Sequence, residues 1–223
     1  MLLNLFRSGF SLEMLVGVCS SIFVVFCTLP IHEFAHAFTA DKLGDPTPRR
    51  QGRLTLNPLA HLDLWGCLLI LLVGFGYAKP VPVNMRNFKN PKAGMALVAL
   101  AGPLSNLIMA FLFLILRAVA IVFISGSFSE VLQFFFYYAA YINISLAVFN
   151  ILPIPPLDGS RLATALLPND VYYKIMQYER YIMIALFVLL LTGALSTPLS
   201  WLSNALLRLI NSIAVLPFKA MLG

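Results

Sequence analysis

Long apolar stretches follow one another along the chain, separated by short polar segments. Nearly all residues are apolar in five of them, which cover residues 14–31, 93–124, 134–152, 181–195 and 199–216. A helix that crosses the hydrocarbon core of a bilayer needs about 20 such residues. We therefore expect an all-α polytopic membrane protein with about five to six transmembrane helices. The first helix continues to about Leu43, where Gly44, Asp45 and Pro46 end it.

A further apolar stretch, Leu64–Tyr77, has only fourteen residues and carries basic residues on both flanks. It is too short to cross a bilayer, and basic flanks collect on one side of a membrane. We expect a re-entrant segment that returns to its starting side. Just before it, leucine alternates with a polar residue at positions 54–57, which predicts a short β-strand within residues 52–58.

The distribution of charge supports this class of protein. Charged residues make up 11% of the chain and hydrophobic residues 60%, whereas ordinary globular proteins carry about 25% charged residues. This composition excludes a nucleic-acid binder, despite the net charge of +6. Because Lys and Arg collect in cytoplasmic loops, we expect an N-terminus outside the cell, a cytoplasmic C-terminus and one domain over residues 1–223. Of the fifteen basic residues, this topology places twelve in the cytoplasm: Lys42, Arg49, Arg50, Arg53, Lys79, Arg86, Lys89, Lys92, Arg161, Lys174, Arg180 and Lys219.

The motif HExxH stands at the cytoplasmic end of the first span, as His32, Glu33 and His36. On a helix, two histidines four residues apart point the same way and can bind one Zn²⁺, with the glutamate beside them as a base for water. The motif also occurs by chance in unrelated chains. Here a charged residue follows a membrane span, where it costs about 2.5–3.5 kcal/mol and calls for a functional reason. We expect a metal site.

A catalytic zinc site uses three protein ligands, so a third must come from elsewhere in the chain. Asp158, Asp63 and His61 are the candidates. Asp158 is expected at the end of the third span, at the depth of the HExxH motif, although 122 residues separate it from His36. It is also a candidate N-cap of the helix that follows, and the two roles are compatible. Other acidic residues are expected on the exposed turn after the first helix or at the opposite side: Asp41, Asp45, Glu13 and Glu130.

Two further polar or helix-breaking features lie within the spans. Gly102 and Pro103 indicate a kink or a close approach of two helices. Asn143 and Asn150 are seven residues apart and share one face of a helix, and for Asn143 helix packing and catalysis both stay open.

Taken together, HEFAH and the NxxPxPPLDG pattern at residues 150–159 resemble the site-2 protease family of intramembrane zinc metalloproteases. The segments GRLTLNPLAHLD (52–63), AKPVPVN (78–84) and AGPLSN (101–106) are similar to those of its compact bacterial and archaeal members. The resemblance extends from about residue 15 to residue 195. No PDZ or CBS module is expected.

This resemblance implies one Zn²⁺ per chain, held by His32, His36 and Asp158, with Glu33 as the general base. It also implies that Asn150 holds the substrate backbone or the oxyanion. The expected activity is hydrolysis of peptide bonds within or near transmembrane segments, as in regulated intramembrane proteolysis. The partners are then membrane-protein substrates and the lipid bilayer, and the active site lies near the cytoplasmic face of the cell membrane.

Two other functions stay open. Histidine and carboxylate residues in membranes also form ion pathways, so one alternative is a divalent-metal transporter. The apparent lack of polar residues leading across the other leaflet argues against it. The second alternative is a catalytically inactive membrane adaptor. For the protease, we expect the strand near residues 54–57 to bind an extended substrate at its edge.

Overall fold

The computed structural model describes residues 11–63, 79–165 and 177–222, together with positions 167, 168, 171, 174 and 175. Within these residues the regular structure is helical throughout, which confirms the all-α fold. In the described part of the chain, four helical segments are long and apolar enough to cross a membrane: Leu12–Lys42, Pro91–Phe123, Ser127–Asn150 and Ser196–Met221. The chain is therefore a multi-pass membrane protein.

The first span is built from α2 (Leu12–Phe23), a π-helical turn (Val24–Thr28) and α3 (Leu29–Lys42). Pro30 accounts for the π turn, because proline has no N–H to donate to the carbonyl four residues earlier and its ring crowds that carbonyl. At 1.5 Å per residue, His32 lies about 30 Å along the helix from Leu12. This distance matches the hydrocarbon thickness, so the HExxH motif falls at the edge of the apolar layer.

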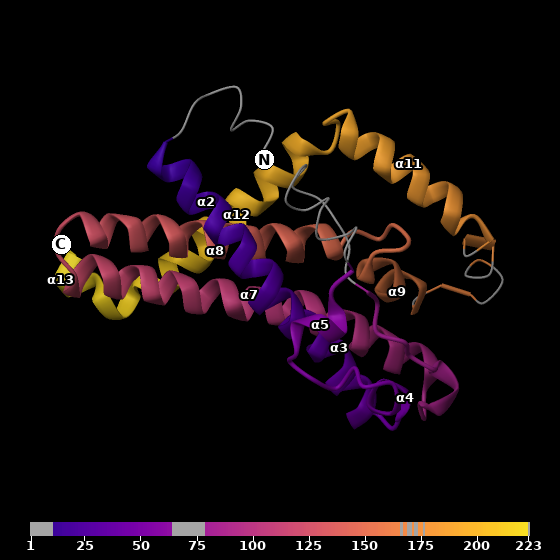
Figure 1. The fold of residues 1–223 in the computed structure, drawn as a ribbon. Helices are drawn as coiled ribbons and strands as arrows, with labels where there is room; N and C mark the ends of the chain where they lie inside the picture. The colour runs from indigo at the N-terminus through magenta and orange to yellow at the C-terminus, as the bar shows by residue number, and fades with distance from the viewer. Residues whose placement is uncertain are drawn as a thin grey trace.

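Helix α7 (Pro91–Phe123) is the centre of the bundle and contacts α3, α8, α9 and α12. The side-chain amide oxygen of Asn90 caps its start by accepting from the backbone N–H of Ala93, and the helix continues through Pro103 without a break. A tight turn with Gly126 at φ +83° reverses the chain into α8 (Ser127–Asn150), which lies antiparallel beside α7 (Figure 1). This pairing forms the core of the molecule.

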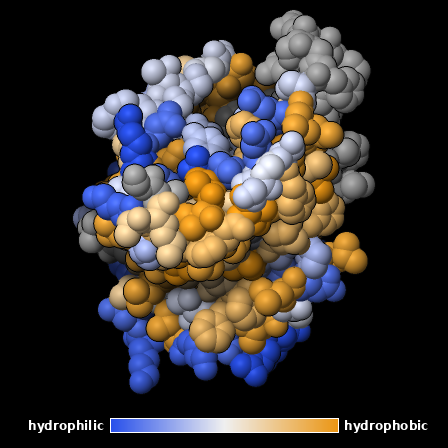
Figure 2. All heavy atoms as spheres, turned by 90° about the vertical axis from the view of Figure 1, so that its left-hand side faces the viewer, coloured by the Kyte–Doolittle hydropathy of each residue, from blue (hydrophilic) through white to orange (hydrophobic). Residues whose placement is uncertain are grey.

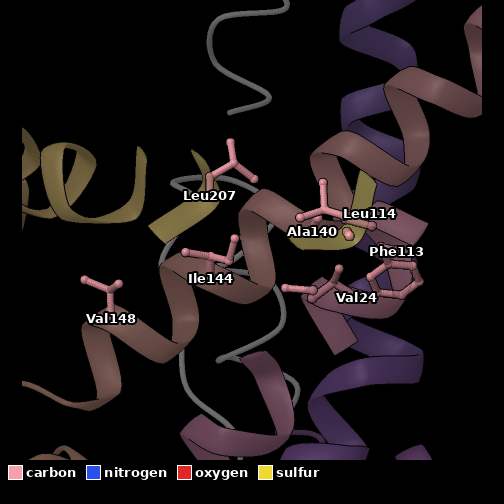
Figure 3. Close-up of a cluster of buried hydrophobic side chains, with 10 residues drawn as sticks. Val24, Phe113, Leu114, Ala140, Ile144, Val148 and Leu207 are labelled. Carbon is pink, nitrogen blue, oxygen red and sulfur yellow. The ribbon is translucent and has the colours of Figure 1, made fainter. Parts of the chain in front are cut away.

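The core between these helices combines small and large apolar side chains. Alanines at their contact bring the two backbones close together, as is common in membrane bundles. In Figure 3 the buried side chains from α7 and α8 meet Val24 of the π turn and Leu207 of α12 (Ser196–Val215). The buried cluster consists of Val24, Ala110, Phe113, Leu114, Ala139, Ala140, Ile144, Val148, Leu207 and Ala214.

Beyond the end of α3, a polar layer is organised around Asp45. Its side chain is 0% exposed and accepts hydrogen bonds from the backbone and hydroxyl of Thr47, the backbone of Asn84 and the amide of Asn87. The expectation that Asp45 lies on an exposed turn is therefore wrong. Burial alone raises the pKa of Asp45, but these hydrogen bonds outweigh it and hold the pKa below its ordinary value.

The re-entrant segment predicted at Leu64–Tyr77 lies outside the described residues. Its two flanks, however, are joined, since the backbone N–H of Lys79 donates to the carbonyl of His61 at 2.8 Å. Arg53 adds a second link by donating to the carbonyls of both Ala60 and Lys79. The two flanks of this segment therefore lie side by side, and its re-entrant course stays a prediction.

The strand predicted within residues 52–58 is wrong. In the structure residues 54–57 form bends and unpaired backbone before α5 (Pro58–His61). The Asn57 side chain caps α5 by accepting from the backbone of Leu59, and a ring nitrogen of His61 bonds the carbonyl of Thr55 at 2.7 Å. Side-chain hydrogen bonds therefore pair with this backbone in place of a neighbouring strand. The predicted strand edge for binding an extended substrate is absent from residues 54–57.

The C-terminal part differs most from the prediction. Helix α11 (Glu179–Leu191) has thirteen residues and is about 20 Å long, which is too short to cross a bilayer, so the span expected at residues 181–195 is not confirmed. Helix α12 leads to α13 (Lys219–Leu222), which lies beside the α7–α8 turn, at the end of the bundle away from α3 and α9 (Figure 1). Because these four candidate spans are counted among the described residues alone, the outside N-terminus and the cytoplasmic C-terminus stay predictions.

Large apolar side chains are exposed on all the long helices, as lipid contact requires. Leu15 of α2, Leu104 of α7, Phe187 of α11 and Trp201 of α12 are each at least 42% exposed. Figure 2 views the end that carries α13, where apolar side chains cover the middle of the face and polar ones gather at its margins.

Candidate active site

His32 and His36 lie on one face of α3, where the 3.6-residue period stacks positions four apart. Both are buried, at 4% and 7% exposure. Their rings meet edge to face with centroids 4.6 Å apart, and their Nε2 atoms are 3.0 Å apart. The two imidazoles therefore direct one nitrogen each toward a common point.

Asp158 joins them as the first residue of α9 (Asp158–Ala165). Its Oδ2 atom lies 3.4 Å from Nε2 of His32 and 3.3 Å from Nε2 of His36. Helices α3 and α9 both pack on α7, so one helix supports all three side chains. Figure 1 shows α3, α5 and α9 gathered at the same end of α7.

The chain reaches Asp158 through a proline-rich turn that folds back on itself. Leu157 donates its N–H to the carbonyl of Ile154, and Ser160 donates to the carbonyl of Leu157. A Cβ at Gly159 would lie 2.5 Å from the carbonyl oxygen of Leu152 and nearer still to that of Ile151. Glycine is therefore required immediately after the aspartate for the turn to close.

The spacing of the three atoms fits a metal ion. They lie 3.0–3.4 Å from one another, and ligands about 2.0–2.2 Å from a tetrahedral Zn²⁺ lie about 3.3 Å apart. Two imidazole nitrogens and one carboxylate oxygen are donors that zinc accepts. The Asp158 side chain keeps 24% exposure, against 4% and 9% for the histidines. Asp158 is therefore the least covered of the three side chains, although its Oδ2 atom, which faces the histidines, is buried.

The remaining hydrogen bonds bear on the protonation of these groups. Nδ1 of His36 lies 2.7 Å from the carbonyl of Val98 on α7, so Nδ1 carries the proton and donates, which leaves the Nε2 lone pair for a metal. Burial raises the pKa of Asp158, but its close contacts with the rings of His32 and His36 outweigh burial and keep the pKa below its ordinary value. Asp158 is a carboxylate at neutral pH.

Glu33 and Asn150, the other predicted site residues, lie on the elements that carry the cluster. Glu33 follows His32 on α3 and is 8% exposed. Asn150 is the last residue of α8 and half-buried, at the point where the chain turns toward Asp158. Their positions leave the predicted roles open.

Comparison with known proteins identifies the family. A family model described as Peptidase family M50 matches residues 117–192. YwhC of Bacillus subtilis (strain 168) is 45% identical over 174 residues, which are 77% of this chain and 80% of YwhC. The chain belongs to peptidase family M50. It is a zinc metalloprotease of the site-2 protease type, as the sequence motifs predict, and zinc is its cofactor.

Two more distant relatives agree with this assignment. Rip2 of Mycolicibacterium smegmatis is 32% identical over 76% of this chain, which spans 65% of the length of Rip2. MJ0611 of Methanocaldococcus jannaschii is 33% identical over 59% of this chain and 62% of MJ0611. All three relatives are named as zinc metalloproteases. No solved structure matches the chain.

The structure distinguishes between the three residues that the sequence offered as candidates for the third metal ligand. Among the described residues, His32, His36 and Asp158 form the one group of histidine, cysteine and acidic side chains able to hold a metal. His61 is buried away from that group and bonds the carbonyl of Thr55, and Asp63 is not part of the group either. Asn143 is 0% exposed and donates to the carbonyl of Ala139 within α8.

Sequence reasoning missed the contribution of α7. The carbonyl of Val98 that orients His36 has no sequence signature, because any residue provides a backbone carbonyl. The pair Gly102 and Pro103 did give a signal, since both are unusual inside a helix. The sequence indicated a kink or a close approach there but not which groups approach.

Proposed function

We propose that this metalloprotease hydrolyses peptide bonds within or near transmembrane segments of membrane-protein substrates, close to the cytoplasmic face of the cell membrane. The observation that carries the proposal is the location of the three convergent side chains. Two of them lie in a 31-residue apolar span, at the end of its apolar part. The other end of the bundle, with the α7–α8 turn, has few basic residues, whereas the loops beside the cluster are rich in them.

We assign the three side chains as zinc ligands and Glu33 as the general base. When bound, zinc supplies the Lewis acidity that makes water a nucleophile at neutral pH and polarises the peptide carbonyl. Glu33 takes a proton from the attacking water and later gives it to the leaving amine, so the proton count is balanced at the end of the cycle. The charges of Zn²⁺, Asp158 and Glu33 sum to zero, which lowers the cost of burying them.

Asn150 is assigned to hold the substrate. Its position at the end of α8, eight residues before Asp158, places it at the entrance to the turn that carries the third ligand. A side-chain amide there can donate to a substrate carbonyl as negative charge develops on its oxygen. Substrate helices must open locally before they reach it, because a helical amide is already hydrogen-bonded.

The test is cleavage of a single-span reporter protein in proteoliposomes. Glu33→Gln removes the base but leaves the three ligands, so we expect retention of one zinc per chain and loss of cleavage. Glu130→Gln is the matched control, because it makes the same change at the other end of the bundle, in the first turn of α8. It should cleave like the original chain.

Fragment masses give the cleavage position, which we expect inside or beside the membrane segment of the reporter. Undiminished cleavage by Glu33→Gln, or cleavage confined to loops far from the membrane, would contradict the proposal. Zinc uptake into the vesicles that survives Glu33→Gln would favour a transporter instead. A cellular phenotype that survives this substitution would favour an adaptor.

A further inference from the structure

Helix α7 passes the two imidazoles at Gly102, which is buried. A Cβ at this position would lie 2.5 Å from Cε1 of His36 and 2.6 Å from Cε1 of His32, and nearer still to Nε2 of His36. Real Cβ atoms essentially never approach other heavy atoms within 3.0 Å. Any residue other than glycine would therefore require both rings, or the helix itself, to move.

The rings have little freedom to move. His36 is hydrogen-bonded through Nδ1 to the carbonyl of Val98, one turn before Gly102 on the same face of α7. Its Nε2 faces Nε2 of His32 at 3.0 Å and Oδ2 of Asp158 at 3.3 Å. A shift that relieves a clash at position 102 must therefore change at least one of these distances.

Gly102 and Pro103 are both unfavourable inside a helix. Their presence in α7 therefore indicates a role other than helix formation. Glycine is a poorer helix former than alanine, and the next residue, Pro103, has no N–H to donate. The chain nevertheless keeps α7 helical from Pro91 to Phe123. The glycine lies where α7 contacts α3, at the level of the histidines rather than at a turn.

We propose that Gly102 is a positioning residue for the metal centre. With no side chain, it lets α7 pack closely enough on α3 for the Val98 carbonyl to hold His36 while both Nε2 atoms converge with Asp158. The proposal rests on the assignment of His32 and His36 as zinc ligands. It adds a determinant of zinc affinity on a helix that contributes no ligand.

The test is the zinc affinity of the purified full chain in detergent, measured by competition with a chromophoric chelator. Gly102→Ala should weaken zinc binding about 10- to 100-fold, the usual effect of disturbing groups that orient metal ligands. Gly94→Ala is the matched control. It is the same substitution in the same helix, and its Cβ would crowd the Phe88 side chain at 2.6–2.9 Å instead of the histidines. It should leave the zinc affinity unchanged.

If Gly102→Ala destabilises the chain, a second measurement shows whether the loss comes from the clash with the histidine rings. The thermal unfolding temperature of the metal-free protein is compared for Gly102→Ala alone and in a His36→Ala background. Removal of the His36 ring relieves most of the clash, so the loss caused by Gly102→Ala should shrink in that background. A purely structural role in helix packing would give the same loss in both.

The outcomes separate this inference from the proposed function. If the original chain binds no zinc, or binds it equally well without His36, the ligand assignment fails. If the original chain binds zinc through His36 and Gly102→Ala binds within twofold of it, only the role of Gly102 is overturned. Equal losses of zinc affinity in Gly94→Ala and Gly102→Ala would also overturn it.

Discussion

Two regions of the bundle are packed to very different degrees. Where α7 meets α3 and α8, Ala37, Ala110, Ala140 and Ile144 are all 0% exposed. In α11, by contrast, Leu186 is the one buried residue of thirteen. The three clustered side chains, His32, His36 and Asp158, lie in or beside the first region. This location indicates that close helix packing sets their geometry. Helix α11 lies outside this framework.

The largest effect is expected from the cluster itself. His36→Ala should weaken zinc binding by more than about 100-fold, because even the loss of an outer hydrogen-bond partner costs about 10- to 100-fold. Asp63→Asn is the control, since Asp63 is a candidate ligand by sequence but is not in the cluster. Zinc content after dialysis, determined by atomic absorption, gives the comparison. Equal zinc loss in both variants would contradict the assignment.

A smaller effect is expected on the free energy of unfolding, which should distinguish the α7–α8 core from α11. Ile144→Ala leaves a cavity in the α7–α8 core and should lower the free energy of unfolding by about 2 kcal/mol, the low end of such substitutions, because the alternative environment is also apolar. Leu189→Ala in α11, at a position 42% exposed, should change it by less than about 0.5 kcal/mol. Unfolding in mixed micelles checks both values, and similar losses would show that α11 packs as tightly as the core.

The smallest effect concerns the polar layer beside the site. The pKa of Asp45 is lower in the folded chain than in the unfolded chain, so its charge stabilises the fold above the ordinary carboxyl pKa of about 4. This stabilisation is lost as the pH falls from that value through the folded pKa. Acidification below about pH 4 should lower the unfolding temperature more for the original chain than for Asp45→Asn. Parallel pH profiles would rule out a contribution from this carboxylate.

The sequence predicted what depends on local spacing and on length. Helical spacing places His32 and His36 on one face, and the end of an apolar stretch indicates that Asp158 reaches the same depth. The structure brings these three side chains together, while their role as zinc ligands stays a proposal. The family and its zinc cofactor were also predicted correctly, because the motifs around these residues are specific.

What the sequence did not predict depends on contacts between distant segments. The burial of Asp45 requires donors from Asn84 and Asn87, about forty residues later. The alternation of apolar and polar residues at positions 54–57 suggested a strand. In the structure the side chains of Asn57 and His61 form hydrogen bonds with the nearby backbone, in place of the bonds to a neighbouring strand. Hydropathy alone also could not show that the helix in the apolar stretch at residues 181–195 is too short to span a membrane.

X-ray absorption at the zinc edge of the purified chain tests the central claim most directly. If His32, His36 and Asp158 hold the ion, the spectrum will fit two imidazole nitrogens and oxygen at about 2.0–2.2 Å, and Asp158→Ala will lose one oxygen scatterer or the metal. A zinc-containing chain whose spectrum shows sulfur ligands, or does not change in Asp158→Ala, would contradict the account.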